Sequence, residues 1–174
     1  LVYSAPAMAA SQSHLTAPET GPQATLVVLD TNVVLAWLVF RDPRVASLAT
    51  ALEAGHVRWL ACPRMRSELT LTLSYPALSK WNPDSKRTLA SFDRWAELLP
   101  DPPAPQASPL LCSDPDDQVF IELALAHQAR WLLTRDRALL KLKRRAAGRG
   151  LQIAPPESWA AAQPSPVQGL TCPA

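Results

Sequence analysis

The chain has 174 residues, 48% of them hydrophobic and 18% charged, so it can bury one hydrophobic core without disulfides or structural metals and is too apolar for an unfolded chain. Its formal net charge of +2 does not by itself indicate a nucleic-acid-binding protein. No apolar run reaches the roughly 18 residues that a membrane helix needs, so we expect no membrane segment.

The two ends of the chain differ in composition from its middle. Residues 1–24 mix Ala, Ser, Pro, Gln and Thr without a sustained period, so we expect a disordered or artefactual leader there. Residues 161–174 are expected to form a Pro-rich flexible tail. One folded domain should occupy residues 25–160.

The three cysteines are far apart and show no C-x-x-C spacing. They indicate neither a disulfide framework nor a zinc site. Such cysteine usage is typical of a reducing compartment, so we expect a cytoplasmic protein.

The first half of the chain predicts two strands and four helices. The short apolar run at 26–29 is rich in β-branched residues, as in a strand buried on both faces. In chain order we expect a strand at 26–29, helices at 33–40 and 45–52, a strand at 57–61, a helix opened by Pro63, and a helix at 84–98. Residues 69–73 also alternate as a strand would, but the helix formers before them favour a helix.

The second half repeats the alternation of helix and strand after a Pro-rich loop at 100–109. Asp114 and Pro115 are suitable for the start of a helix. We expect a helix at 114–127, a strand at 131–134, a helix at 137–145 and a strand at 151–154. Strands that alternate with helices predict an α/β fold, a mostly parallel sheet covered on both sides.

Four acidic residues lie beside elements predicted to be buried. Asp30 and Asp136 each follow a predicted strand and precede a predicted helix. Taken alone, an aspartate at such a position is more often an N-cap, which stabilises a helix by about 1 kcal/mol. Asp117 could belong to a capping arrangement with Asp114, and Glu68 could lie on a solvated helix face.

The helical spacing of two of these residues favours a shared acidic pocket instead. Asp117 lies on the same predicted helix face as Phe120, Ile121 and Ala124. Glu68 shares a face with apolar residues of its own helix in the same way. An inward carboxylate is costly unless a cation compensates it, and several such carboxylates at the carboxyl end of a parallel sheet predict a Mg²⁺ or Mn²⁺ site.

The order of these residues resembles the PIN-domain ribonucleases, and is most similar to the VapC-like toxin components of bacterial toxin–antitoxin pairs. The motifs are Leu29-Asp30-Thr31-Asn32, a mid-chain Glu68, Asp114-Pro115-Asp116-Asp117 leading to Ala124, and Leu133-Thr134-Arg135-Asp136. The resemblance spans about residues 26–158. Single motifs of this kind are weak, but four in the correct order and spacing are fairly specific.

The resemblance implies a PIN-like three-layer α/β/α sandwich and a divalent-metal-dependent endoribonuclease. It implies that Asp30, Glu68, Asp117 and Asp136 are catalytic and hold Mg²⁺ or Mn²⁺, and that Asn32 and Thr134 are auxiliary polar residues. It also implies an RNA substrate, a small antitoxin partner that covers the acidic pocket, and a homodimer.

The segment from 130 to 149 is rich in Arg and Lys and contains Asp136 as its single carboxylate. A solvated helix face explains such a run, and so does a basic surface that binds RNA phosphates. Under the second interpretation we expect Arg135, Arg137 and Lys141 to contact the RNA backbone.

Two other classes of function remain open. A haloacid-dehalogenase-like phosphatase also has an Asp after its first strand, but it needs a second Asp two residues later, where this chain has Asn32. A PIN-like binding module that has lost catalysis and acts through a protein or RNA partner would look the same at all four acidic positions. Chelator-sensitive RNA degradation would separate the nuclease from the binding module.

Overall fold

Five parallel strands form the centre of the molecule, in a computed structural model that describes residues 24–103 and 110–162. The strands are β1 (Thr25–Leu29), β2 (Val57–Ala61), β3 (Ala96–Leu98), β4 (Trp131–Leu133) and β5 (Gln152–Ala154), and their order in the sheet is β3-β2-β1-β4-β5. Every neighbouring pair is parallel, so all carboxyl ends meet at one edge.

The first strand lies in the middle of the sheet. Val27 of β1 is in register with Trp59 of β2 on one side and with Trp131 of β4 on the other. Val27 and Val28 are completely buried, and Leu29 is nearly so. The uninterrupted apolar run of β1 follows from this position, because helices cover both faces of a parallel sheet.

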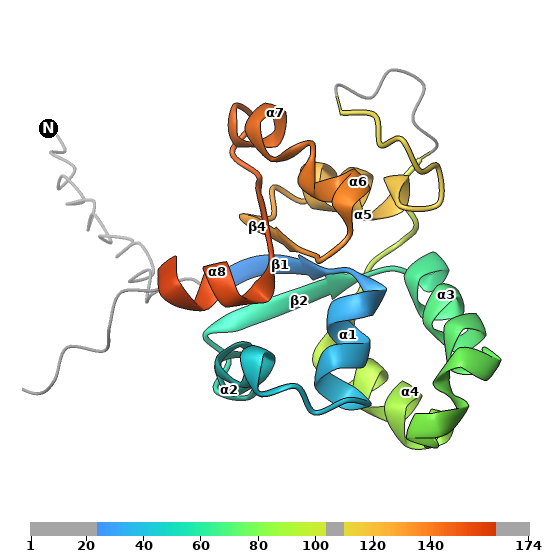
Figure 1. Cartoon of the computed structure of the whole chain (residues 1–174). Helices are drawn as coiled ribbons and strands as arrows, with labels where there is room; N and C mark the ends of the chain where they lie inside the picture. The colour runs from blue at the N-terminus through green and yellow to red at the C-terminus, as the bar shows by residue number, and fades with distance from the viewer. Residues whose placement is uncertain (1–23, 104–109, 163–174) are drawn as a thin grey trace, which may run out of the picture.

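The helices lie on both sides of the sheet, as Figure 1 shows. On one side are α5 (Gln118–Ala126), α6 (Arg137–Leu140) and α7 (Lys143–Ala147), and on the other are α1 (Thr31–Leu38), α2 (Ala46–Glu53) and α4 (Ser85–Trp95). Next to α4 lies α3 (Pro63–Leu73), and the remaining elements are the 3₁₀ turns η1 (Pro43–Val45) and η2 (Pro76–Trp81) and the helix α8 (Pro156–Ala162). The predicted three-layer α/β/α architecture is confirmed.

Three predicted helices differ from the observed ones. The helix expected at 84–98 ends at Trp95, because Ala96–Leu98 pairs with β2 as an edge strand. The helix expected at 114–127 begins only at Gln118, because Asp114 accepts a hydrogen bond from the Asp116 amide (3.0 Å) and closes a turn. The helix expected at 137–145 is two short helices, α6 and α7.

The structure describes only part of the two chain ends. All of the expected leader except Ala24, and the expected tail from residue 163 onwards, lie outside the described residues. Helix α8 was not predicted; it extends through Ala162, and its Trp159 is 2% exposed. Within residues 24–103 and 110–162, no helix has the length and apolar character needed to cross a lipid bilayer.

Candidate functional site

The carboxylate of Asp30 lies at the centre of the carboxyl edge of the sheet. It follows β1 directly, is 4% exposed, and caps α1 by accepting a hydrogen bond from the Asn32 amide (3.4 Å). Its other oxygen, Oδ2, accepts hydrogen bonds from the Asn32 side-chain amide and from the Thr134 hydroxyl. The two auxiliary polar residues named from the sequence therefore both hold Asp30.

The loop after β4 brings Asp136 to the same edge. The Asp136 amide donates to the Thr134 hydroxyl oxygen (2.8 Å), and the Asp136 carboxylate caps α6 at the Ala138 amide. The Arg135 amide donates to Asn32 Oδ1 (3.2 Å). Because β1 and β4 are adjacent, these bonds join two loops about a hundred residues apart in sequence.

Asp117 and Glu68 approach this edge from two separate helices. Asp117 precedes α5 at the N-cap position but accepts no capping hydrogen bond, so the capping explanation fails for its side chain. Glu68 lies on α3, which packs against both α1 and α5. Both side chains are half-buried.

Burial and the charges of neighbouring carboxylates raise the pKa values of three of the four acidic residues, Asp30, Glu68 and Asp117. Burial, followed by the charges of Asp30 and Asp136, raises the pKa of Asp117 to about 7. Burial also raises the pKa of Glu68, with a further increase from Asp30 and an opposing hydrogen bond from the Thr31 hydroxyl. Like charges at short range disfavour joint ionisation, so this cluster needs a cation to be fully charged.

The pKa of Asp30 is raised as well, mainly because its carboxylate is buried. The hydrogen bonds from Thr134 and Asn32 oppose this rise, and the charge of Asp136 adds to it. Neutral donors do not cancel the charge of a buried carboxylate, so a nearby cation would stabilise the ionised form of Asp30.

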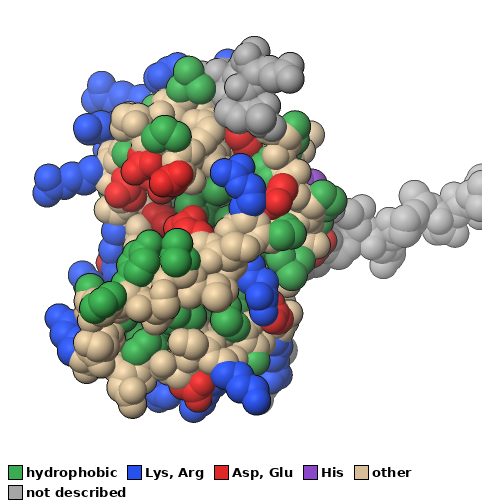
Figure 2. All heavy atoms as spheres, turned by 90° about the vertical axis from the view of Figure 1, so that its right-hand side faces the viewer, with side chains coloured by type: hydrophobic (Ala, Val, Ile, Leu, Met, Phe, Trp, Pro, Cys, Tyr) green, Lys and Arg blue, Asp and Glu red, His purple; other side chains and the backbone are tan. Residues whose placement is uncertain are grey.

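Figure 2 shows acidic side chains gathered around a recess on the face towards which the strands point. Within the described part of the chain, no three Asp, Glu, His or Cys side chains stand in a geometry that could hold a metal ion. Asp30 and Asp136 direct oxygens at their capping amides. The donor chemistry, hard carboxylate oxygens, fits Mg²⁺ or Mn²⁺, but direct ligation needs rotation of side chains.

Arg135, which we expected to contact RNA from the basic segment, is paired with carboxylates of the protein itself. Its guanidinium forms ion pairs with Asp42 of the α1–η1 connection (3.1 Å) and with Glu157 of α8. A contact between Arg135 and RNA would require one of these pairs to open. Arg137 and Lys141, in contrast, are exposed on and after α6.

Sequence reasoning missed the roles of two kinds of residue near the site. The hydrogen bond from Thr31 to Glu68 had no signal beyond the position of Thr31 next to Asp30. Asp114 and Asp116 are not among the expected site residues, yet their charges raise the pKa values of Asp117 and Glu68 respectively. Their clustering in sequence was the available signal.

A family model described as PIN domain matches residues 26–138, which include all four acidic positions. The chain belongs to the PIN domain family. Among solved structures, this PIN domain is similar to a chain of the crystal structure of VapBC2 from Rickettsia felis bound to a DNA fragment from their promoter. The TM-score is 0.50 at 17% sequence identity, covering 74% of this chain and 97% of that chain. No curated protein sequence matches the chain.

Proposed function

We propose that this PIN domain is a divalent-metal-dependent endoribonuclease that hydrolyses RNA phosphodiester bonds. The observation that carries the proposal is the mutual electrostatic influence of Asp30, Glu68, Asp117 and Asp136 at one edge of the sheet. A structural role accounts for two of them, since Asp30 and Asp136 are N-caps. It does not account for Asp117, which is half-buried among like charges and caps nothing.

Asp30, Asp117 and Asp136, with Glu68, would hold the Mg²⁺ or Mn²⁺. When bound, the metal supplies an activated water and neutralises charge on the phosphate oxygens. Thr134 and Asn32 keep the Asp30 carboxylate in place through hydrogen bonds. The charge of the carboxylates, not a side-chain nucleophile, is the contribution of the protein to this chemistry.

The test is cleavage of RNA by the purified protein in Mg²⁺ or Mn²⁺, with and without a chelator. We expect cleavage that the chelator abolishes, and a loss of at least about a hundredfold in Asp117→Asn and Asp30→Asn, because each removes a charged ligand of the metal. Asp93→Asn is the matched control, since it removes the same charge from Asp93 on α4, whose carboxylate forms a surface ion pair with Arg66 of α3. Cleavage by Asp117→Asn at the wild-type rate would remove this residue from the active site.

We further propose that the chain is the toxin of a type II toxin–antitoxin pair and acts in the cytoplasm. The support is the fold shared with a chain of the VapBC2 structure and the likeness of the acidic motifs to VapC-like toxins. The partner would be a small antitoxin that places a cation among the carboxylates, and the chain would form a homodimer. Co-expression with the product of a short neighbouring reading frame should suppress both toxicity and RNA cleavage.

A PIN-like binding module without catalysis is the second candidate. It is favoured by the finding that no three ligand-type side chains within residues 24–103 and 110–162 stand ready to hold a metal. Binding of RNA or a protein without any metal-dependent cleavage would support this candidate. A haloacid-dehalogenase-like phosphatase is disfavoured by Asn32, whose amide donates to Asp30 where that chemistry needs a second carboxylate.

A further inference from the structure

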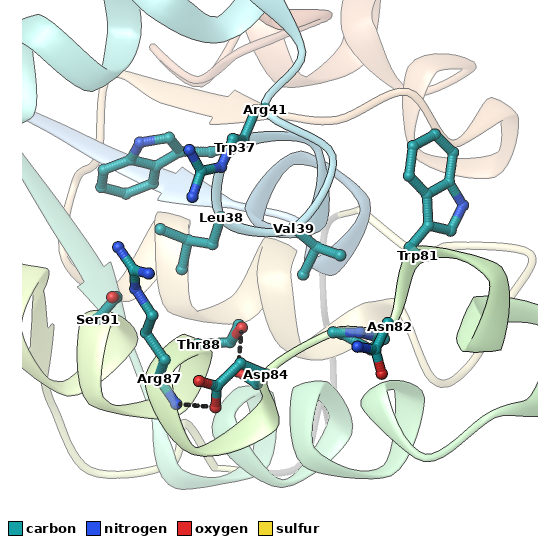
Figure 3. A pocket seen from close by; sticks show the side chains of 11 residues that line it. Trp37, Leu38, Val39, Arg41, Trp81, Asn82, Asp84, Arg87, Thr88 and Ser91 are labelled. Carbon is teal, nitrogen blue, oxygen red and sulfur yellow. Dashed lines mark hydrogen bonds between the residues drawn. The ribbon is translucent and has the colours of Figure 1, made fainter.

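A second recess, away from the acidic cluster, lies between the end of α1, the turn η2 and the start of α4. Its volume is about 340 Å³. Figure 3 shows the side chains that line it, with Leu38 near its middle and Arg41, Trp37, Arg87 and Trp81 around it.

The recess carries unpaired positive charge. Arg41 and Arg87 both line it, and neither guanidinium forms an ion pair with a carboxylate anywhere in residues 24–103 and 110–162. The carboxylate that lines the recess, Asp84, accepts a hydrogen bond from the Arg87 amide (2.9 Å) and so caps α4. The two guanidinium groups outnumber this one carboxylate, so the recess carries a net positive charge and favours an anion.

The backbone at the rim is strained at two positions. Among the described residues, Arg41 (φ 51°) and Asn82 (φ 42°) are two of the three non-glycine residues with positive φ, and both line this recess. Arg41 lies three residues after the end of α1 with a left-handed φ, which glycine adopts most readily, and the Asp42 amide that follows it donates to the Ala36 carbonyl (2.8 Å). A non-glycine residue in this conformation is a candidate for a functional role of its side chain.

Aromatic rings lie beside these cations. Trp81 is 50% exposed and packs against Phe40 with ring centroids 4.8 Å apart. Trp37 packs against Trp59 and Trp95, which hold its ring at the wall of the recess. Positive groups next to accessible rings are typical of grooves that bind single-stranded nucleic acid, where bases stack on the rings and cations hold phosphates.

We propose that this recess is a non-catalytic subsite that holds a phosphate of single-stranded RNA several nucleotides from the bond to be cut. The proposal rests on the proposed nuclease function. Helix α1 joins the two sites, because Asp30 caps its first turn and Leu38 ends it within the recess. Its 8 residues span about 12 Å, which roughly three to four nucleotides cover at ~3.4 Å per nucleotide. An acidic protein segment is the alternative ligand: it fits the positive charge of the recess, but it gives the exposed ring of Trp81 no base to stack on.

The test measures affinity for a labelled single-stranded RNA of about 12 nucleotides, within the range of known single-strand sites, in EDTA so that no metal-assisted cleavage occurs. The variants are Arg87→Ala and Arg41→Gly, and Lys86→Ala is the matched control, since Lys86 is the neighbouring exposed cation on α4 outside the recess. We expect each arginine variant to bind about threefold or more weakly and to lose about 0.7 from the slope of log affinity against log salt. Glycine accepts the φ of residue 41, so Arg41→Gly should remain folded.

Three results would overturn the subsite. The first is that both arginine variants bind RNA with wild-type affinity, and the second is that Lys86→Ala loses as much affinity as they do. The third is that the arginine variants keep their RNA affinity but no longer bind a hexaglutamate peptide, which would assign the recess to an acidic protein partner. The same measurements distinguish failure of the subsite from failure of the proposed nuclease function. Metal-dependent cleavage with unaltered affinity in the arginine variants would refute the subsite alone, whereas weakened binding without any cleavage by the wild type would refute the nuclease alone.

Discussion

At the scale of single residues, Asp117 is the carboxylate whose surroundings most demand a metal. It is half-buried, it caps no helix, and the charges of Asp30, Asp136, Asp114 and Glu68 all raise its pKa, after burial, to about 7. An acid in this position is largely protonated below neutral pH, when it cannot act as a charged ligand. Metal binding, and with it cleavage, should therefore weaken as the pH falls below about 7.

The same shift predicts how stability depends on pH without metal. The pKa of Asp117 rises from 3.8 to about 7 on folding, so between these values the folded state binds more protons than the unfolded state. The contribution of Asp117 to stability is therefore lost as the pH rises through this window. In EDTA, Asp117→Asn should remove this pH-dependent loss of unfolding free energy. We expect the loss to be on the order of 1 kcal/mol, since solvent screens the charge of a half-buried group and so reduces its effect. Urea unfolding at about pH 5 and about pH 8 measures it; identical pH dependence in variant and wild type would contradict the shift.

Metal should stabilise the folded protein through the same carboxylates. Mn²⁺ at about a hundred times its dissociation constant adds about 2.7 kcal/mol to the free energy of unfolding, because the unfolded chain lacks the site. We expect a higher melting temperature for the wild type and a much smaller increase for Asp117→Asn. Asp93→Asn, outside the cluster, should respond as the wild type does. No response of the wild type to Mn²⁺ or Mg²⁺ would argue against a metal site.

At the scale of elements, the loop between β4 and α6 determines where Thr134 and Asp136 lie. Arg135 in this loop is tied to Asp42 and Glu157, so two distant segments, the end of α1 and the start of α8, hold it from outside. The guanidinium of Arg44 beside Asp42 keeps the pKa of that carboxyl far below its usual range, so the Asp42 carboxylate that holds Arg135 stays charged at all ordinary pH values.

Removing this tie should affect activity more than stability. Arg135→Met keeps the length of the side chain but loses both ion pairs, which at partly exposed positions contribute about 1 kcal/mol in total. We expect a severalfold loss of RNA cleavage, because the loop that carries Thr134 and Asp136 gains freedom. Arg130→Met is the control, since Arg130 is exposed just before β4, on the opposite edge of the sheet, and forms no ion pair within the described residues. Equal cleavage by both variants would show that the tie does not position the loop.

At the scale of the whole molecule, α8 closes the core. It contacts α2 and η1, and its Trp159 is 2% exposed although it lies close to the end of the described chain. The indole Nε1 of Trp159 has no hydrogen-bond partner within the described residues, so the ring stabilises the fold through its apolar surface.

Trp159→Ala should lower the free energy of unfolding by about 3–5 kcal/mol, because it leaves a cavity in the core. Trp159→Phe should cost less, since no hydrogen bond of the indole is lost. Trp81→Ala is the control, with half of its ring exposed, and should cost much less. Chemical unfolding of the three variants measures the differences. A small effect of Trp159→Ala would show that α8 is a peripheral attachment.

Much of the fold was predictable because its elements carry local patterns. The run at 26–29 is apolar throughout and forms a strand buried on both faces. The error at 96–98 has a plain reason: nothing in Ala96–Leu98 is typical of a strand, and the segment is extended because β2 offers a free edge. The start of α5 was placed too early because Asp114 is suited both to a helix cap and to a turn.

The candidate site was predictable only as a set of residues. Their identities followed from their place at the ends of predicted strands and on inward helix faces, and the N-cap roles of Asp30 and Asp136 followed from the same positions. Neither the hydrogen bond of Thr31 to Glu68 nor the ion pairs of Arg135 had any local signal, since both depend on which helices come together.

The amino-acid sequence by itself determined the alternation of strands and helices, the parallel sheet and the acidic residues at its carboxyl edge, because hydrophobic period and capping are properties of neighbouring residues. Only the tertiary structure decided that β4 lies beside β1, so that the Thr134 hydroxyl reaches the Asp30 carboxylate across 104 positions of the chain. It also decided which cations are neutralised, as Arg135 is, and which form no ion pair with the described part of the chain, as is the case for Arg41 and Arg87. Apolar burial has no direction of its own, so the partners of each charge depend on the packing of the whole chain.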